Sequence, residues 1–426
     1  MRMKLTTWIF LAMLAGIGVG WMCHALLPTP ESAKTVAGYI SLLTDIFLRL
    51  IKMIIAPLVF STLVVGIAHM GDTKAIGRIG AKTMAWFICA SLMSLLLGLV
   101  LVNVLRPGDA LDLPLPDAGA SSTLKTSSLS LKEFVTHLVP RSVFEAMANN
   151  EILQIVVFSA FFGGAAASFG EKARAVIDWV EQVSHVMLKI TAYVMALAPI
   201  AVFAAMASVV TTQGLGILWT YGRFMGEFYL GILLLWGVLT VAGFLFLGPR
   251  VLRLVALIRE PILLAFSTAS SEAAYPNTLE QLERFGASKK ITSFVLPLGY
   301  SFNLDGSMMY CTFATMFIAQ AYDIGLTIGQ QLTMLLLLMV TSKGMAGVPR
   351  ASLVVIAATL ATFNIPEAGL LLIMGIDQFL DMGRSATNVV GNSLATAVVA
   401  KWEGELKPEA QAQAEVDADE GLPAPA

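Results

Sequence analysis

A stripe of polar side chains near the end of the chain has the types and spacing of a binding site for a charged small molecule. Asp377, Asp381, Arg384, Asn388 and Asn392 follow steps of 4, 3, 4 and 4 residues, which places them on one face of an α-helix. Arginine can hold a carboxylate through two parallel hydrogen bonds in a dry site. An aspartate one turn away can hold an ammonium group, and asparagine offers donors and acceptors. The complement of this set is a zwitterion with an additional acid, such as glutamate or aspartate.

The same stripe has a purely structural explanation. Asp381 and Arg384 stand three residues apart and can form an ion pair that only supports helix packing. That explanation does not account for the polar interruptions in the same third of the chain, which lie between short apolar pieces at 267–272 and 342–350 and within a long span at 301–307. Their tips offer backbone N–H groups and hydroxyls that can cradle a second carboxylate. One interruption contains Asn303 and Asp305, whose oxygen atoms are hard ligands for a small cation.

The composition indicates that membrane helices position these residues. Hydrophobic residues make up 57% of the 426 residues and charged residues 13%, with 27 Lys and Arg against 29 Asp and Glu. An average soluble domain carries roughly 25% charged residues, and the mean hydropathy here is +0.78. A soluble fold this poor in charge would expose a large apolar surface to water. We therefore predict an all-α polytopic membrane protein, and we exclude a soluble enzyme, a secreted disulfide scaffold and a nucleic-acid binder.

Loop charges predict the topology. Apolar segments are expected at 7–27, 39–70, 83–105, 143–169, 175–211 and 218–248. The first is long enough to span and is interpreted as a helix rather than a signal peptide. Arg2 and Lys4 place the N-terminus in the cytoplasm by the positive-inside rule, and the loop charges alternate consistently from there. The region 402–426 has no apolar periodicity and is predicted to be a disordered cytoplasmic tail.

The last third of the chain follows a different pattern, in which two short pieces and a long span alternate. The pairs of short pieces lie at 256–285 and 328–363, and the long spans at 291–322 and 366–401. Gly and Pro interruptions at corresponding places in two halves indicate an inverted repeat. Each pair would form a re-entrant hairpin, whose polar tip requires burial in protein or contact with a watery cavity.

Four motifs in order resemble the glutamate/aspartate and dicarboxylate:cation symporter family. They lie at 267–272, 303–307, 346–349 and 377–392, and the resemblance covers about 1–405. It implies a homotrimer of elevator-type transporters in the bacterial inner membrane, with eight transmembrane helices, two re-entrant hairpins and both termini in the cytoplasm. Region 1–255 would hold six helices, of which the first, second, fourth and fifth form a scaffold. The third and sixth would join the transport core at 256–401, and the second hairpin would be the outer gate.

The resemblance also assigns substrate contacts. Arg384 would bind the side-chain carboxylate, and Asp381 would bind the amino group. The other implied contacts are Ser270, Ser271, Ser307, Gly347, Val348, Ser385 and Asn388. The branch that carries C4-dicarboxylates usually lacks an acid at the position of Asp381. We therefore predict import of glutamate or aspartate, with malate, fumarate or succinate as the alternative substrate class, and no enzymatic activity or cofactor.

The coupling ion is predicted from ligands that the chain lacks. The cation-binding positions implied by the resemblance are Gly299, Ser301, Asn303, Asp305, Ser342, Met345, Asn388 and Asn392. Asn392 replaces the usual aspartate, and on the third span Phe87 and Ala90 leave only the hydroxyl of Ser91. Fewer anionic and hydroxyl ligands weaken binding of a hard cation. The prediction therefore favours H⁺ over Na⁺, with Na⁺ at Gly299, Asn303, Asn388 and Asn392 as the alternative.

A proton requires only a carboxylate that burial makes easier to protonate. The candidates are Glu272, Asp305, Asp377 and Asp381. Glu272 also has a structural explanation, since an acid at a hairpin tip can cap the N-terminus of a half-helix.

Overall fold

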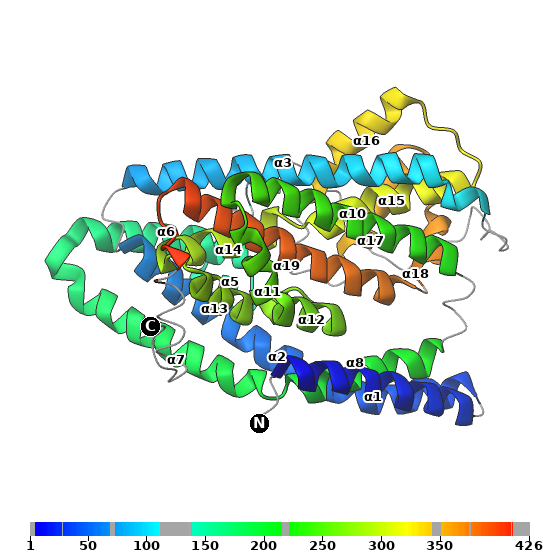
Figure 1. Ribbon diagram of the computed structural model, residues 1–426, viewed down its shortest axis with the longest axis horizontal. Helices are drawn as coiled ribbons and strands as arrows, with labels where there is room; N and C mark the ends of the chain where they lie inside the picture. Colours follow the sequence, from blue (N-terminus) through cyan, green and yellow to red (C-terminus); the bar gives the residue numbers. More distant parts are fainter. Residues whose placement is uncertain are drawn as a thin grey trace.

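The computed structural model describes residues 5–27, 29–68, 73–110, 136, 139–214, 221–342, 351–374, 376–409 and 411. Within these ranges the chain is almost entirely helical and contains no strand beyond one isolated bridge between Ala287 and Leu406. Five segments are long and apolar enough to cross a membrane: Thr7–Leu26, Pro30–Ala68, Gly77–Asp109, Ile152–Met195 and Gly222–Leu247. Most long helices run along the long axis of the molecule, as in a multi-pass membrane protein (Figure 1).

A first group of helices packs together along one side of the molecule (Figure 1). Its members are α1 (Leu5–Leu26), α2 (Pro30–Ala68), α6 (Ile152–Phe169), α7 (Arg174–Met195) and α8 (Ala198–Gln213). Glycines let α1 approach α8 closely. A Cβ atom at Gly16 would lie 2.5 Å from the carbonyl oxygen of Phe203, and one at Gly20 would lie 2.7 Å from that of Ala207. Only glycine therefore fits at these two positions without displacing a backbone.

Two predicted spans of this region are interrupted in the structure. The predicted span 175–211 is divided between α7 and α8 at Ala196 and Leu197, just before Pro199 in the first turn of α8. Proline lacks the N–H that would continue a helix and is favoured at a helix start. The predicted span 143–169 is divided between α5 (Val143–Ala148) and α6, where Asn150 has a φ of 54°. Asparagine tolerates this left-handed conformation better than most residues.

A second group surrounds α19, the last long helix. Its members are α3 (Thr73–Leu105), α10 (Gly222–Leu247), α12 (Arg259–Thr268), α13 (Tyr275–Phe285), α14 (Lys289–Phe302), α15 (Asp305–Ala321), α16 (Ile328–Thr341), α17 (Ala351–Thr362) and α19 (Asp377–Trp402). Helix α19 packs against α10, α12, α14 and α15, and all its residues from 382 to 400 are buried. Figure 1 shows it between α10 and α12. Polar side chains on α19 therefore face protein rather than lipid.

Helix interruptions lie close to this central helix. Ala269 ends α12 with a φ of 49°, and 269–274 leads through the short helix η3 (Glu272–Ala274) into α13. A left-handed non-glycine residue costs about 1–2 kcal/mol, so packing must hold this turn in place. Asn303 and Leu304 separate α14 from α15. Both breaks expose backbone groups next to the polar residues that the sequence singled out.

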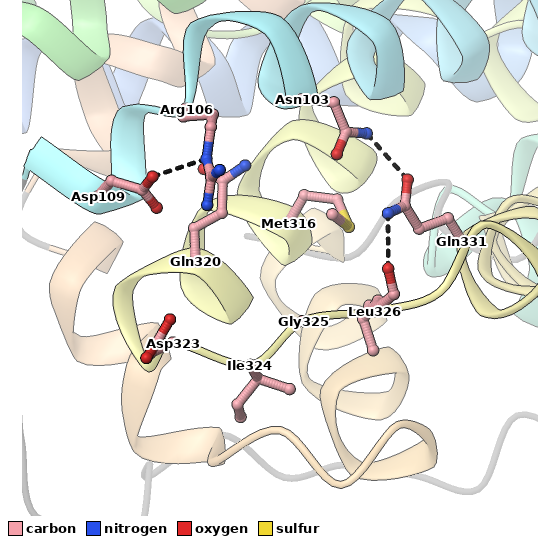
Figure 2. A pocket seen from close by; sticks show the side chains of 10 residues that line it. All are labelled: Asn103, Arg106, Asp109, Met316, Gln320, Asp323, Ile324, Gly325, Leu326 and Gln331. Atoms are coloured by element: carbon pink, nitrogen blue, oxygen red, sulfur yellow. Dashed lines mark hydrogen bonds and ion pairs between the residues drawn. The ribbon is translucent and has the colours of Figure 1, made fainter.

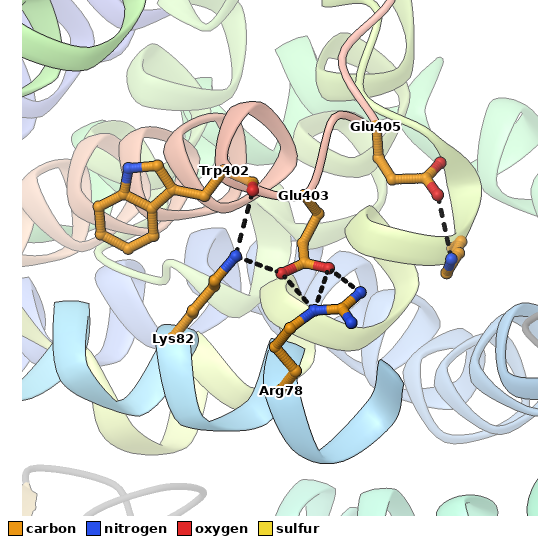
Figure 3. Close-up of polar contacts among 6 residues, drawn as sticks. Arg78, Lys82, Trp402, Glu403 and Glu405 are labelled. Carbon is orange, nitrogen blue, oxygen red and sulfur yellow. Dashed lines mark hydrogen bonds and ion pairs between the residues drawn. The ribbon is translucent and has the colours of Figure 1, made fainter. Parts of the chain in front are cut away.

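The chain beyond α19 is held against other helices. The carboxylate of Glu403 pairs with Arg78 at 2.7 Å and with Lys82 at 2.6 Å (Figure 3). The backbone N–H of Ser288 donates to the carbonyl of Glu405 at 3.0 Å, and that of Lys407 donates to Gly286 at 2.9 Å. Residues 403–409 belong to the region predicted to be a disordered tail, yet these contacts give them a defined place between α3 and the turn that precedes α14.

The Glu403 ion pairs should stabilise the fold in a pH-dependent way. The Arg78 guanidinium, with Lys82, holds the pKa of Glu403 below its usual 4.5, so folding favours the charged carboxylate. This stabilisation is complete above about pH 4.5 and is lost as the pH falls through the lowered pKa. We expect Glu403→Gln to reduce the free energy of unfolding by roughly 1 kcal/mol at pH 7, measured as a lower thermal midpoint in detergent.

The matched control is Glu171→Gln, because Glu171 pairs with Arg174 at 3.5 Å and both side chains are exposed. It should leave the midpoint unchanged. The difference between Glu403→Gln and the wild type should shrink as the pH is lowered below 4.5. A difference that stays constant down to pH 3 would contradict the ion-pair explanation.

Candidate functional site

Arg384 forms the centre of a buried charge cluster on α19. Its side chain is 1% exposed, and Nη2 lies 2.9 Å from Oδ1 of Asp381 and 3.2 Å from Oδ1 of Asp377. The guanidinium carbon lies 4.1 Å from the ring centroid of Tyr310, and the Tyr310 hydroxyl donates to Asp377 at 3.2 Å. The buried Nη1 has no hydrogen-bond partner in the part of the chain that the structure describes. Three residues of the predicted stripe, Asp377, Asp381 and Arg384, therefore meet in one cluster, in which one guanidinium nitrogen has no partner among the described residues.

The cluster is open on the side of Asp381. The side chain of Asp381 is 34% exposed, whereas that of Asp377 is 3% exposed. A buried charge must be paired, because leaving it unpaired costs several kcal/mol. Arg384 is paired with both carboxylates, so the ion pair expected from the structural explanation is present. Chemically, the arrangement offers a cationic donor next to an accessible carboxylate, which matches a zwitterionic ligand.

A second polar cluster surrounds the break between α14 and α15. The Nδ2 atom of Asn303 donates to Oδ2 of Asp305 at 3.0 Å and to Oδ1 of Asn392 at 3.2 Å. Ser94 of α3 donates its hydroxyl to Oδ1 of Asp305 at 3.3 Å. Asn303, Asp305 and Asn392 are fully buried, and Oδ1 of Asn303 has no hydrogen-bond partner among the described residues. A side chain at Gly299 would collide with the amide of Asn392, so glycine gives this amide its space.

Asn388 connects the two clusters. Its Oδ1 accepts a hydrogen bond from the backbone N–H of Gly306 at 3.0 Å, and its Nδ2 lies 3.4 Å from the hydroxyl of Ser307. Asn388 lies one turn beyond Arg384 and one turn before Asn392 on α19. Asn388 therefore lies between the two clusters on α19 and contacts the first turn of α15.

The predicted residues of the first hairpin lie at the turn between α12 and α13. Ser270 accepts a hydrogen bond from the backbone of Ala273 at 3.3 Å, and Ser271 is half-buried. Glu272 lies in a small space that it lines together with Ile55 of α2 and Ile152 of α6. Glu272 thus faces the boundary between the two helix groups, and it is not one of the ion-pair partners of Arg384.

The remaining predicted residues are only partly described. Ser301, Ser342 and Ser385 are buried, and the hydroxyl of Ser301 has no hydrogen-bond partner among the described residues. The Ser342 hydroxyl lies 3.3 Å from the carbonyl of Met339 at the end of α16. Three further predicted residues, Met345, Gly347 and Val348, lie outside the described residues.

Two residues of the clusters escaped the sequence analysis. Tyr310 lies five positions after Asp305, in an apolar run where an aromatic residue is expected to pack in the core. Ser94 lies one turn beyond Ser91, on the same side of α3. Extending the search for hydroxyl groups by one turn along the third span would have found Ser94. Tyr310 gives no comparable pattern, because its role depends on a contact between separate helices.

A cavity of about 210 Å³ lies away from these clusters, where α16 begins beside the end of α3. Its lining includes Asn103, Arg106, Asp323 and Gln331 (Figure 2). The amide of Asn103 donates to Oε1 of Gln331 at 2.9 Å. None of the predicted site residues lines this cavity. The hydrogen bond between Asn103 and Gln331 holds α16, the first helix of the second predicted hairpin, against α3.

Comparison with known proteins identifies the family of the chain. The sodium:dicarboxylate symporter family matches residues 5–402. A C4-dicarboxylate transport protein of Laribacter hongkongensis is 41% identical over 95% of this chain and 91% of its own length. Proton/sodium-glutamate symport proteins of Bacillus caldotenax and Bacillus subtilis are 40% and 38% identical, over 94% and 96% of this chain and 95% and 94% of their own lengths. The chain therefore belongs to the sodium:dicarboxylate symporter family.

Proposed function

We propose that this symporter imports glutamate or aspartate. The observation that carries the proposal is the buried guanidinium of Arg384, whose Nη1 has no partner among the described residues, beside the partly exposed carboxylate of Asp381. In a site shielded from water, Arg384 would bind the side-chain carboxylate of the substrate. Asp381 would bind its ammonium group, and Ser307 and Asn388 would supply hydroxyl and amide contacts.

The second candidate is a C4-dicarboxylate such as succinate, malate or fumarate. The relative from Laribacter hongkongensis carries the name of a C4-dicarboxylate transport protein, which supports this alternative. A dicarboxylate carries the same two carboxylates as aspartate but has no ammonium group to pair with Asp381, so its greater net negative charge would lie near Asp377 and Asp381. Like charges at close range disfavour binding. This argument favours the amino acid.

We assign the coupling ion to the cluster of Asn303, Asp305 and Asn392, and we favour H⁺. The cluster combines two neutral amides with one carboxylate, and Asn392 supplies no negative charge to a cation. Asp305 can instead take up a proton, and the contact of Asn388 with Gly306 and Ser307 would link that event to the substrate contacts. The energetic link between two sites is reciprocal, so substrate should also favour binding of the ion. Sodium at Gly299, Asn303, Asn388 and Asn392 is the alternative.

The proposed mechanism is an elevator within a homotrimer. The first helix group would form the scaffold, and the second, with α19 at its centre, would be the transport domain that carries both clusters across the bacterial inner membrane. The close packing of α3, α10, α12, α14 and α15 around the last helix supports movement as one body. Both chain termini would lie in the cytoplasm, and the second hairpin would act as the outer gate.

Uptake into proteoliposomes tests substrate and ion together. With no sodium present, an inward pH gradient should drive accumulation of aspartate and glutamate but not of succinate. If a sodium gradient supports accumulation and a pH gradient does not, the proton assignment is wrong. Accumulation of succinate without aspartate would overturn the amino-acid assignment.

Asp381→Ser should reduce aspartate binding much more than succinate binding. The serine removes a charged partner of the ammonium group, and hydrogen bonds to charged groups contribute about 1.5–3 kcal/mol. The expected result is a roughly 10- to 100-fold rise in the Kd of aspartate, measured by calorimetry, against a small change for succinate. Asp178→Ser on the exposed face of α7 is the control. Equal losses for both ligands would argue against the ammonium role.

A further inference from the structure

One face of helix α10 contacts α19 beside the polar stripe and includes none of the proposed substrate or ion contacts. Tyr229, Ile232 and Trp236 are spaced by three and four residues, so they lie on one side of α10. On α19 the facing residues are Phe379, Gly383 and Thr387, spaced by four and four. This second stripe runs beside the stripe of Asp381, Arg384 and Asn388: Phe379 lies two residues before Asp381, and Gly383 and Thr387 directly precede Arg384 and Asn388.

Two side-chain hydrogen bonds fasten these faces together. The Tyr229 hydroxyl donates to the carbonyl of Phe379 at 2.6 Å, and both groups are partly buried. The indole N–H of Trp236 donates to the hydroxyl of Thr387 at 2.8 Å. Thr387 donates in turn to the carbonyl of Gly383 at 2.8 Å. The two bonds lie about two turns apart along α19, so together they resist both rotation and sliding of that helix.

Gly383 makes the two helices approach closely between these bonds. A Cβ atom at Gly383 would lie 2.7 Å from Cδ1 of Ile232 and 2.9 Å from a ring atom of Tyr229. Real Cβ atoms do not approach other atoms so closely, so a side chain at position 383 would have to displace Ile232 or Tyr229 within a densely packed interior. The backbone of α19 is therefore held directly against α10 at the residue before Arg384.

Each hydrogen bond acts on a different part of the stripe. Phe379 lies two residues before Asp381, in the first turn of α19. Thr387 lies between Arg384 and Asn388. It also lies close to Gly306, because a Cβ atom added at Gly306 would be 2.8 Å from the Cβ atom of Thr387. Gly306 is the residue whose N–H donates to Asn388. The bond of Tyr229 thus holds the turn with the proposed ammonium partner, and that of Trp236 holds the turn with the carboxylate-binding groups.

We propose that Tyr229 and Trp236 are positioning residues that set the substrate preference of the site. Tyr229 fixes the turn of Asp381 and thereby favours substrates with an ammonium group. Trp236 fixes the turn of Arg384 and Asn388 and thereby supports every carboxylate substrate. This inference rests on the proposed function, since it uses the roles proposed there for Asp381 and Arg384.

The test compares two deletions of a single hydrogen bond by calorimetry in detergent at one pH and ion composition. Tyr229→Phe should raise the Kd of aspartate about fivefold, the size of one neutral hydrogen bond, and leave that of succinate unchanged. Trp236→Phe should raise both Kd values by a similar factor. Tyr221→Phe removes a hydroxyl from the residue at the N-terminus of the same helix and should change neither value.

The opposite pattern would overturn the proposal. If Tyr229→Phe leaves the Kd of aspartate unchanged, or weakens both ligands equally while the protein stays folded by its thermal midpoint, Tyr229 does not select the ammonium substrate. Thr387→Val deletes the acceptor of Trp236, so adding it to Trp236→Phe should produce no further loss. A full additional loss would show that the two residues act independently.

A further readout separates this proposal from the proposed function. If the wild type binds neither aspartate nor succinate, the proposed substrate class is wrong, but the contact between helices can still be measured. The indole N–H resonance of Trp236, identified by its absence in Trp236→Phe, should shift in Thr387→Val. An unchanged resonance would show that the hydrogen bond does not form, and the positioning role would then be rejected.

Discussion

Arg384→Ala should abolish the accumulation of acidic amino acids in proteoliposomes. The substitution removes the only cation of the described cluster and leaves Asp377 and Asp381 without their shared partner. Truncating one partner of a buried, hydrogen-bonded charge pair costs about 2–5 kcal/mol, so the Kd of aspartate should rise roughly 100-fold or more. Uptake of labelled glutamate and calorimetry with aspartate measure the two effects.

Arg384→Lys separates charge from geometry in the same position. Lysine keeps the positive charge and can pair with Asp377, but it lacks the planar fork that holds a carboxylate through two bonds. We expect this variant to fold like the wild type by gel filtration and to bind aspartate weakly. Arg174→Ala, at an exposed ion pair of α7, is the control for loss of an arginine. Glutamate uptake retained in Arg384→Ala would exclude the proposed carboxylate role.

The sequence predicted the parts of the site that depend on local geometry. Asp377, Asp381 and Arg384 lie on one helix, and helical periodicity alone places them on a common face. The cost of polar groups in lipid requires a polar stripe on a membrane helix to face protein, and Asp377 and Arg384 are buried in the structure. The break at Asn303 was also predictable, since polar residues interrupt an apolar span there. These predictions needed no knowledge of how separate helices pack.

The contacts between separate helices could not be derived from residue patterns. Asn303 and Asn392 are 89 positions apart, and only the family resemblance suggested that they share a site. Tyr310 and Trp236 lie in apolar helices, where an aromatic residue is expected whether or not it makes a specific polar contact. The ordered path of 403–409 was missed because these residues have no apolar periodicity. Hydrogen bonds and ion pairs to distant helices hold them instead.

The same distinction decides how the coupling ion can be identified. The side-chain types around Asp305 favour a proton, because Asn392 brings no second negative charge. Backbone carbonyls can also bind sodium, however, and residue types do not reveal them. The property to test at this site is therefore the carboxylate of Asp305, which either ion would require. Asp305 is fully buried, with the Asn303 amide and the Ser94 hydroxyl donating to its two oxygens. Replacing it by asparagine keeps the shape and removes the ability to change charge.

Asp305→Asn should uncouple transport from the ion gradient while leaving substrate exchange intact. The variant can neither bind a proton at this position nor offer a negative charge to sodium, so an inward pH or sodium gradient should drive accumulation at least about tenfold less than in the wild type. Exchange of external for internal aspartate in preloaded proteoliposomes needs no net ion movement and should continue. Ser94→Ala removes one donor to the same carboxylate and should weaken coupling only partly. Wild-type accumulation in Asp305→Asn would place the coupling ion elsewhere, and Glu272, at the boundary between the two helix groups, would then be the next carboxylate to replace.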